Sequence, residues 1–316
     1  MRVPFAVPRA PAGGFDVVGL GLNSVDFVTV VAEFPRTNSK QRLQHFARLP
    51  GGQTATAMAV CARLGWRASY LGRFGSDDLG ALSRESLDCE GVDTAAALTV
   101  PGARNQFAVI LVDARSGERT VLWERDPALI MTPSDVVRDT ILAGRMLLVD
   151  CHETAAATEA ARHARSAGIP TVLDVEKVRP GIAELLQLTD AIIAAEAFPA
   201  EFTGYDSPGR ALEAMAEEFE APLVAVTLGA EGSLARCQGR EIRTPAFRVD
   251  CVDSTGAGDA FHGGFAAACL MGELDLEDAL AYANGVAALN CRALGARGGM
   301  PTRSDVARLL DARARQ

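Results

Sequence analysis

The sequence predicts an α/β fold of three layers, with helices on both faces of a mainly parallel sheet. Two observations lead to this prediction. Short apolar runs alternate with longer, alanine-rich stretches of helical periodicity, which is the pattern of parallel strands joined by crossover helices. The 316 residues are 48% apolar and 22% charged, so the chain has ample apolar material for a core. We expect residues 1–316 to form a single α/β domain.

The predicted strands are short apolar runs, and the predicted helices are the longer stretches between them. Strands are expected at Phe15–Gly21, Ala68–Gly72, Met146–Asp150, Thr171–Asp174, Ala191–Ala194 and Leu223–Thr227, with one more ending near Val249. Helices are expected at Gln53–Leu64, Leu79–Cys89, Ala155–Ala167, Ile182–Leu188, Arg210–Phe219, Ala257–Met271, Leu276–Ala293 and Ser304–Arg313. Residues 1–14 are rich in Pro, Gly and Ala, and we expect them to form a flexible tail.

Two segments interrupt this alternation and predict a small β-sheet lid. Residues 26–50 alternate branched, aromatic and polar side chains, as strands with one solvated face do. Residues 103–125 contain an apolar strand, a turn at Ser116-Gly117 and a second strand. Neither segment has the pattern of a helix that faces a core. We therefore expect both to project from the main domain as one lid.

Charge and composition exclude several classes of protein. With 31 Lys+Arg against 40 Asp+Glu, the formal net charge of −9 argues against nucleic-acid binding. No apolar run approaches the ~20 residues of a membrane-spanning helix, and residues 1–14 lack the apolar region of a signal peptide. The seven cysteines are scattered without a CxxC pair and the four histidines are isolated, so neither a zinc site nor a disulfide framework is predicted. Reduced cysteines indicate a cytoplasmic protein.

The strongest local motif is VDSTGAGDAFHGG at Val252–Gly264. Small residues form a tight turn there and an apolar helix follows, so the first amides of the helix are unpaired and form an anion hole. Asp259 lies in the first turn of that helix. A carboxylate beside an anion hole makes chemical sense as a base that removes a proton from an attacking hydroxyl. On the turn alone, a helix-capping role for Asp259 is an equally good interpretation.

Two further glycine-rich stretches precede or follow predicted elements. Gly51-Gly52 stands before the first predicted helix, where bare backbone can contact a polyol. VAVTLGAEGS at Val224–Ser233 is a strand that runs into a turn with Gly229 and Gly232, and nucleotides bind at such strand ends in open α/β sheets. Each motif by itself is also compatible with an ordinary turn.

Taken together, the three motifs resemble the ribokinase-like PfkB family of carbohydrate kinases over Val17–Pro301. GGQTATAMAVCARLGWRASYLGRFGSDDLG resembles the N-terminal signature of that family, and DSTGAGDAFHGGF resembles its C-terminal signature. VTLGAEGS is similar to the nucleotide loop. The resemblance implies a three-layer α/β/α ribokinase-like core with a lid. It also implies an enzyme that transfers the γ-phosphoryl group of ATP to a sugar hydroxyl.

The resemblance also implies roles for individual residues. Asp259 would be the catalytic base, and the backbone of Gly256, Ala257 and Gly258 would form the anion hole. The sugar pocket would contain Asn23, Asp26, Gly51, Gly52, Thr56, Asn105 and Arg125. ATP would contact Thr227, Gly229, Gly232 and Asn284. Asp253 and the carbonyl of Thr255 would bind a monovalent cation such as K⁺, and Mg²⁺ would bridge the ATP phosphates.

Two positions depart from the family pattern. Thr56 stands where the first signature usually has Asn, so the side-chain amide is replaced by a hydroxyl. The N-x-x-E motif that helps to place Mg²⁺ is absent, because Ala195 and Phe198 occupy its positions. Glu196 or Glu201 could compensate, or the metal relies on the phosphates and water.

The substrate class is left with several alternatives. The GG-x-x-A-T-A form and Gly298–Pro301 look nearest to ketohexokinase-like and sulfofructose-kinase-like members, so a neutral ketose or related sugar is the first hypothesis. A phosphorylated or sulfonated ketose would need basic partners, for which the candidates are Lys40, Arg42, Arg104 and, above all, Arg125. A nucleoside kinase would stack a base on the lid aromatics Phe27, Phe34, Phe46, Phe107 and Trp123. A non-catalytic binding protein is a further alternative, and a homodimer through the lid is expected by resemblance.

Overall fold

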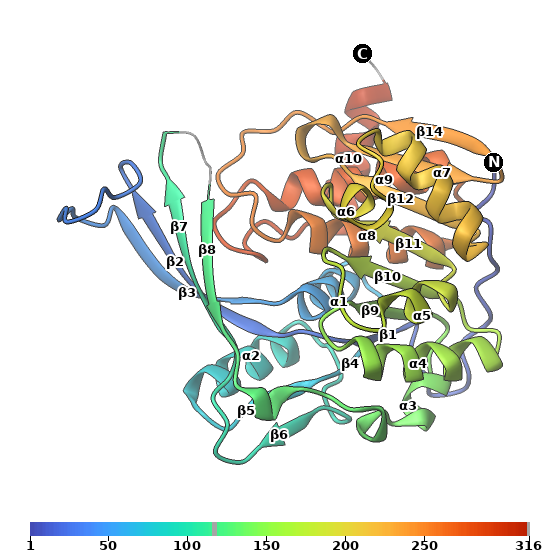
Figure 1. Cartoon of the computed structure of the whole chain (residues 1–316), viewed down its shortest axis with the longest axis horizontal. Coiled ribbons are helices and arrows are strands. Elements are labelled where there is room, and N and C mark those ends of the chain that lie inside the picture. Colours follow the sequence, from blue (N-terminus) through green and yellow to red (C-terminus); the bar gives the residue numbers. More distant parts are fainter. Residues whose placement is uncertain (116–118, 315–316) are drawn as a thin grey trace.

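The computed structural model describes residues 1–115 and 119–314 and has an eight-stranded sheet with helices on both faces (Figure 1). The strand order is β14-β13-β12-β11-β10-β9-β1-β4. The bounds are β1 Val17–Leu20, β4 Ala68–Leu71, β9 Leu147–Asp150, β10 Thr171–Val175, β11 Ala191–Ala194, β12 Leu223–Thr227, β13 Ser233–Cys237 and β14 Arg240–Thr244. The strands from β12 to β4 are parallel, whereas β13 and β14 are antiparallel to their neighbours. The predicted α/β fold is confirmed.

Helices pack against each face of this sheet through two separate apolar clusters. One cluster joins the sheet to α1 Gln53–Arg63, α2 Asp78–Cys89, α8 Ala257–Met271, α9 Leu276–Asn290 and α10 Arg303–Ala314. The other joins it to α3 Arg138–Leu142, α4 Thr154–Ser166, α5 Ile182–Gln187, α6 Phe198–Thr203 and α7 Pro208–Phe219. The carboxyl ends of the parallel strands therefore lie at one edge between the two helical layers, where ligands of open α/β sheets bind.

The predicted lid is a four-stranded sheet with the order β3-β2-β7-β8, and it projects from the domain (Figure 1). Its strands are β2 Ser24–Val31, β3 His45–Gly51, β7 Phe107–Asp113 and β8 Arg119–Glu124. On the face toward the domain, Val28, Ile110 and Val112 form a small apolar cluster together with Leu294. The predicted turn at Ser116-Gly117 lies outside the described residues. A separate two-stranded sheet joins β5 Arg73–Gly75 to β6 Leu98–Val100.

The structure differs from two of the sequence-based expectations. Residues 1–14 do not extend freely, since the Leu276 amide donates to the Met1 carbonyl at 2.7 Å and Phe5 packs against the core. No strand ends at Val249, because β14 stops at Thr244 and the following Pro245 has no amide to continue the ladder. Among the described residues, no helix has the length and apolarity needed to span a membrane.

Candidate active site

The N-terminus of α8 presents unpaired backbone amides at the carboxyl edge of the sheet. Gly256 precedes the helix in the left-handed conformation, with a φ of 73°, and a Cβ there would lie 2.4 Å from the Ala296 carbonyl oxygen. The Ala257 amide donates to the Ser254 carbonyl at 3.2 Å. Among the described residues, the amides of Gly256, Gly258 and Asp259 have no acceptor. The turn can therefore bind an anion, through these three amides and not through that of Ala257.

Asp259 lies in the first turn of α8, half-buried and close to other carboxylates. Burial raises the pKa of Asp259 to about 8, and the negative charges of Asp174, Glu176 and Asp26 act in the same direction. The positive charge of His262 opposes them. A raised pKa makes a carboxylate a stronger base, which suits proton removal from an alcohol.

His262 connects the anion-hole turn to the end of β10. Its ring is 2% exposed, with Nδ1 2.7 Å from the Gly258 carbonyl oxygen and 3.4 Å from Oδ2 of Asp174. Nε2 lies 3.2 Å from the Ile193 carbonyl oxygen. Burial lowers the pKa of His262, while its two carbonyl contacts favour the protonated ring. Sequence reasoning did not connect this histidine with a site, because Asp174 and Ile193 are distant from it along the chain.

Asp26 and the diglycine form a second polar pocket at the base of the lid. Asp26 is 5% exposed, and its Oδ1 accepts a hydrogen bond of 3.1 Å from Ser24 Oγ. A Cβ on Gly51 would lie 2.3 Å from Asp26 Oδ2, and one on Gly52 would lie 2.4 Å from the Cα of Asn23. Burial raises the pKa of Asp26 to about 6, with Arg297 opposing the shift. Glycines are needed here because the carboxylate and the backbone approach so closely.

Two of the predicted acceptor residues, Asn23 and Asn105, have their polar groups engaged within the protein. The Asn23 amide group donates to Tyr70 Oη and to the Arg73 carbonyl, and its oxygen accepts from Ser83. Asn105 accepts from the Gly75 amide and donates to the Gln106 carbonyl. These contacts shape the pocket wall and the base of β7.

Arg125 forms a buried ion pair with Glu153 and also donates to the Leu129 carbonyl and to Gln106 Oε1. Its charge is therefore compensated by the chain itself. Arg104 pairs with Glu124 on the lid surface. Neither arginine presents an uncompensated charge to the pocket.

Thr56 is buried in α1, and its Oγ1 accepts a hydrogen bond of 3.1 Å from Nε of Arg297. Arg297 follows α9 and is a pocket residue that the sequence analysis missed. In this part of the chain, only Gly298–Pro301 contributed to the predicted resemblance. An arginine among glycines in a connecting loop was the available signal.

The predicted nucleotide residues lie together at the ends of β12 and β13. Gly229 and Gly232 both have positive φ values, of 53° and 96°, and a Cβ on Gly232 would lie 2.1 Å from the Thr244 carbonyl oxygen. Thr227 Oγ1 donates to the Ala194 carbonyl at 3.4 Å. Asn284 donates to Ser233 Oγ and to the Thr244 carbonyl, so its amide nitrogen joins α9 to the edge strands. The predicted nucleotide residues are therefore near one another, and their role in binding ATP stays a prediction.

The residues predicted for metal binding fit only in part. Asp253 accepts hydrogen bonds of 2.8 Å from the amides of Thr255 and Gly295, which fixes the loop that precedes the anion hole. Thr255 Oγ1 is buried without a partner among the described residues. Glu196 and Glu201 are exposed. In residues 1–115 and 119–314, no group of three His, Cys, Asp or Glu side chains is arranged to hold a metal ion.

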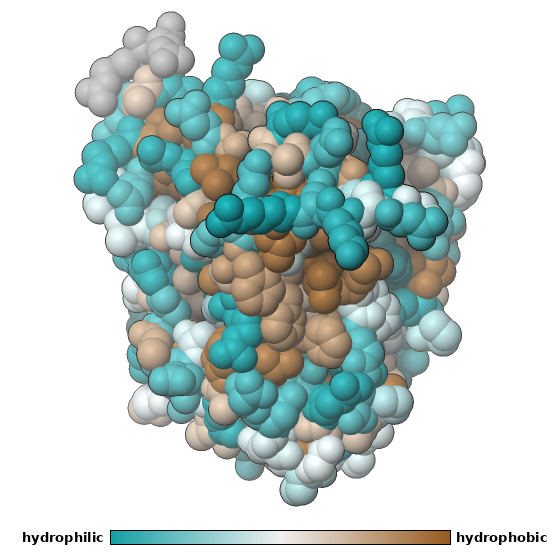
Figure 2. All heavy atoms as spheres, turned by 90° about the vertical axis from the view of Figure 1, so that its left-hand side faces the viewer, coloured by the Kyte–Doolittle hydropathy of each residue, from teal (hydrophilic) through white to brown (hydrophobic). Residues whose placement is uncertain are grey.

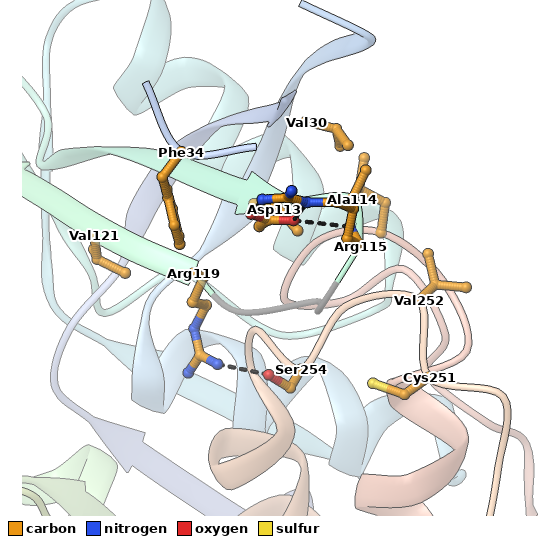
Figure 3. A pocket seen from close by; sticks show the side chains of 12 residues that line it. Val30, Phe34, Asp113, Ala114, Arg115, Arg119, Val121, Cys251, Val252 and Ser254 are labelled. Carbon is orange, nitrogen blue, oxygen red and sulfur yellow. Dashed lines mark hydrogen bonds and ion pairs between the residues drawn. The ribbon is translucent and has the colours of Figure 1, made fainter. Parts of the chain in front are cut away.

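A cavity of about 1090 Å³ separates the inner face of the lid from the loop before α8 (Figure 3). Val30, Phe34 and Val121 form its lid side, and Cys251 and Val252 lie opposite. Arg119 of β8 spans the gap, and its NH1 donates to Ser254 Oγ at 2.6 Å. The lid thus already contacts the loop that leads into the anion hole.

Comparison with known proteins identifies the family of this chain. The family model described as pfkB family carbohydrate kinase matches residues 15–303. The chain is 30% identical over 295 residues to a ribokinase of Bacillus subtilis, which covers 92% of this chain and 98% of that protein. It is 28% identical over 321 residues to fructokinase-1 of Oryza sativa subsp. japonica, which covers 93% and 97%. The structure of Arabidopsis thaliana ribokinase complexed with ribose and ATP superimposes with a TM-score of 0.81 at 26% identity, covering 94% and 99% of the two chains. The chain belongs to the pfkB family of carbohydrate kinases, which are phosphotransferases with an alcohol as acceptor.

Proposed function

We propose that this chain is an ATP-dependent sugar kinase that phosphorylates a hydroxyl of a ketose or a related carbohydrate. The observation that carries the proposal is the position of Asp259, a half-buried carboxylate of raised pKa beside the three unpaired amides of the α8 turn. The negative charge of Asp26, which we assign to the acceptor pocket, contributes to the raised pKa of Asp259. The similarity to ribokinase and fructokinase supports a sugar as acceptor.

In the proposed mechanism, Asp26 and the backbone of Gly51 and Gly52 bind the hydroxyls of the sugar. Asp259 accepts the proton of the reacting hydroxyl as the hydroxyl oxygen attacks the γ-phosphorus of ATP. The bond between that phosphorus and the β,γ-bridging oxygen breaks, and ADP leaves. The amides of Gly256, Gly258 and Asp259 stabilise the negative charge on the transferred phosphoryl group, which is the largest contribution in such reactions. The lid covers the sugar and excludes water.

Metal ions complete this proposal. Asp174 faces His262, and Glu176 pairs with His152 and Arg179. The ligands of Mg²⁺ would therefore be mainly phosphate and water oxygens, which is the ligand type that Mg²⁺ prefers. Mg²⁺ would neutralise phosphate charge when it is bound with ATP. We also propose Asp253 and the Thr255 carbonyl as the K⁺ site, because Asp253 accepts from the amides of Thr255 and Gly295 in the loop before the anion hole.

The other acceptor classes have weaker support. Phe27 packs against Phe46 and Phe107 with ring centroids 6.2 and 5.8 Å away, on the face of the lid that points away from the domain. These three rings are therefore not placed to stack on a nucleoside in the pocket, whereas Phe34 lines the cavity and Trp123 lies on the inner face of the lid. The pairing of Arg125 with Glu153 and of Arg104 with Glu124 gives no support to a phosphorylated or sulfonated sugar.

An ATP-consumption screen tests the proposed function. It covers ketoses, aldoses, sugar acids, phosphosugars and nucleosides, each with and without K⁺. We expect turnover with a neutral sugar, fastest with ketoses. Turnover with nucleosides alone would contradict the proposed substrate class, and no turnover with any acceptor would indicate a binding protein.

Gly258→Ala is expected to lower kcat about 100-fold without changing the melting temperature. A Cβ on Gly258 meets nothing within 4 Å, so the fold has room for it. The added methyl group would occupy the space in front of the amides, where the phosphoryl group must bind. Loss of one anion-hole interaction costs roughly 10²–10³ in kcat. Steady-state kinetics and thermal unfolding measure both effects, with Gly209→Ala of α7 as a control, because a Cβ there would meet only the flexible end of the Glu241 side chain. An unchanged kcat would place the phosphoryl group elsewhere.

We also propose that two chains form a dimer through the outer faces of their lids. Apolar side chains gather at the centre of the face shown in Figure 2, which is the side from which the lid projects. On the face of the lid that points away from the domain, Phe46 and Leu122 are 54% and 58% exposed. Burial of such a surface by a second lid would stabilise the dimer.

Phe46→Glu is expected to convert this dimer into a monomer. Size-exclusion chromatography with light scattering should give twice the mass of one 33.2 kDa chain for the wild type and the single mass for the variant. Leu98→Glu alters another exposed leucine outside the lid and should leave the dimer intact. A monomeric wild-type protein would refute the proposed interface.

A further inference from the structure

The loop after α9 is fixed to the back of the anion-hole turn. The Gly295 amide donates to Asp253 Oδ2 at 2.8 Å. Ala296 packs so closely on Gly256 that a Cβ on Gly256 would clash with it. Asn290 Nδ2 donates to the Ala296 carbonyl at 2.9 Å and supports the loop from below. A displacement of this loop would therefore displace the anion-hole turn.

From the same loop, Arg297 reaches to the opposite side of the site. Its NH2 donates to the Gly51 carbonyl at 2.9 Å, where β3 of the lid ends. Its Nε donates to Thr56 Oγ1 of α1 at 3.1 Å, and its NH1 donates to Ser86 Oγ of α2 at 2.9 Å. One side chain thus contacts the lid and two helices.

The charge of Arg297 is buried without an ion pair. The residue is 9% exposed, and its three acceptors are a carbonyl and two hydroxyl groups. No carboxylate of a described residue lies within ion-pair distance of it. Among the negative charges that act on Arg297, that of Asp26 has the largest effect. Burial of a charge is costly, so a hydrophobic or neutral residue would be the simpler choice if the position served packing alone.

We propose that Arg297 is a positioning residue that fixes the position of the acceptor pocket relative to the anion hole. It fixes the Gly51 carbonyl and Thr56 on the acceptor side, while its own backbone is fixed to the turn that receives the phosphoryl group. Its positive charge favours the ionised form of Asp26, which accepts hydrogen bonds from neutral sugar hydroxyls. This inference rests on the proposed kinase function.

Arg297→Gln is expected to raise the KM for the acceptor sugar at least 10-fold and to change the KM for ATP less than twofold. Arg297→Lys keeps the charge but cannot make all three hydrogen bonds, so it should restore only part of the affinity. Without the nearby positive charge, Asp26 binds protons more readily. The pH below which the acceptor KM rises should therefore move upward in Arg297→Gln and much less in Arg297→Lys. Arg308→Gln, at an exposed arginine of α10, is the control.

A structural role alone would produce a different result. It would lower the melting temperature and affect both KM values equally, with no shift of the pH profile, and that result would overturn the inference. Where Arg297→Gln does not fold, Ser86→Ala and Thr56→Val each remove one of its acceptors and should give smaller changes of the acceptor KM alone.

A second measurement does not require the acceptor to be known. Hydrogen exchange is followed with and without MgADP. In the wild type, we expect MgADP to slow exchange at residues 45–51 of the lid. In Arg297→Gln, this effect at the lid should be lost while MgADP still protects residues 256–260. Equal lid protection in both proteins, or none in the wild type, would overturn the inference. Absence of sugar turnover in the wild type would instead refute the proposed function.

Discussion

Asp259→Asn is expected to lower kcat about 1000-fold and to leave the affinity for ATP within twofold of the wild type. Asparagine fills the same space but cannot accept a proton, and general-base catalysis contributes roughly 10²–10⁴ to such rates. A 1000-fold loss corresponds to ~4 kcal/mol of transition-state stabilisation. Steady-state kinetics with the preferred sugar gives kcat, and calorimetric titration with MgADP gives the nucleotide affinity.

The control for this variant is Asp305→Asn, at a surface carboxylate of α10 far from the site. A kcat within threefold of the wild type in Asp259→Asn would refute the assignment of the base. Loss of MgADP binding together with kcat would instead indicate that Asp259 maintains the turn.

The pH dependence of the same reaction gives an independent check. Asp259 must be deprotonated to act as a base, and its pKa is raised. We therefore expect kcat/KM to increase with pH through that pKa and to be lost below it. The charge of Asp174 contributes to the raised pKa. In Asp174→Asn, the acid limb should therefore move to lower pH, and an unmoved limb would assign it to another group.

Asp26→Asn is expected to lower kcat/KM for the acceptor about 100-fold, mainly through KM. Among the described residues, Ser24 is the one hydrogen-bond partner of the buried carboxylate, so its remaining lone pairs are available to sugar hydroxyls. Hydrogen bonds to a charged group contribute ~1.5–3 kcal/mol each, and an amide can replace only part of this. The KM for ATP should change little.

Asp78→Asn is the matched control for this second variant. Asp78 is an exposed carboxylate that pairs with Arg48 of the lid, so it tests for a general effect of charge near the lid. An acceptor KM that is unchanged in Asp26→Asn would exclude Asp26 from the sugar pocket.

The parts of the site that were predictable from sequence consist of residues that lie close together along the chain. The α8 turn needs Gly256 because of one positive φ and one close contact, and both leave a local signature of small residues before a helix. The strands β11 and β12 were predicted to the residue, because each is a buried apolar run with turns on both sides. The antiparallel strands β13 and β14 were missed, since their mixed polar pattern follows the glycine turn without an apolar run.

The residues that the sequence could not place depend on contacts between distant segments. Arg297 acts on Gly51 and Thr56 across more than 240 positions, and nothing in its own neighbourhood reveals them. Asn23 and Arg125 show the opposite case, in which contacts within the fold are not visible from the sequence. Each has a side chain suited to binding a sugar, but Tyr70, Ser83 and Glu153 use those polar groups within the fold. The cytoplasmic location and the role of K⁺ stay predictions.

The most direct test of the catalytic assignment is a crystal structure of the protein with its acceptor sugar and a non-hydrolysable ATP analogue. We predict that an Asp259 carboxylate oxygen lies about 2.6–3.2 Å from the reacting hydroxyl. The γ-phosphoryl group should face the amides of Gly256, Gly258 and Asp259. A complex in which Asp259 points away from the sugar, with the phosphoryl group bound outside the α8 turn, would contradict the account.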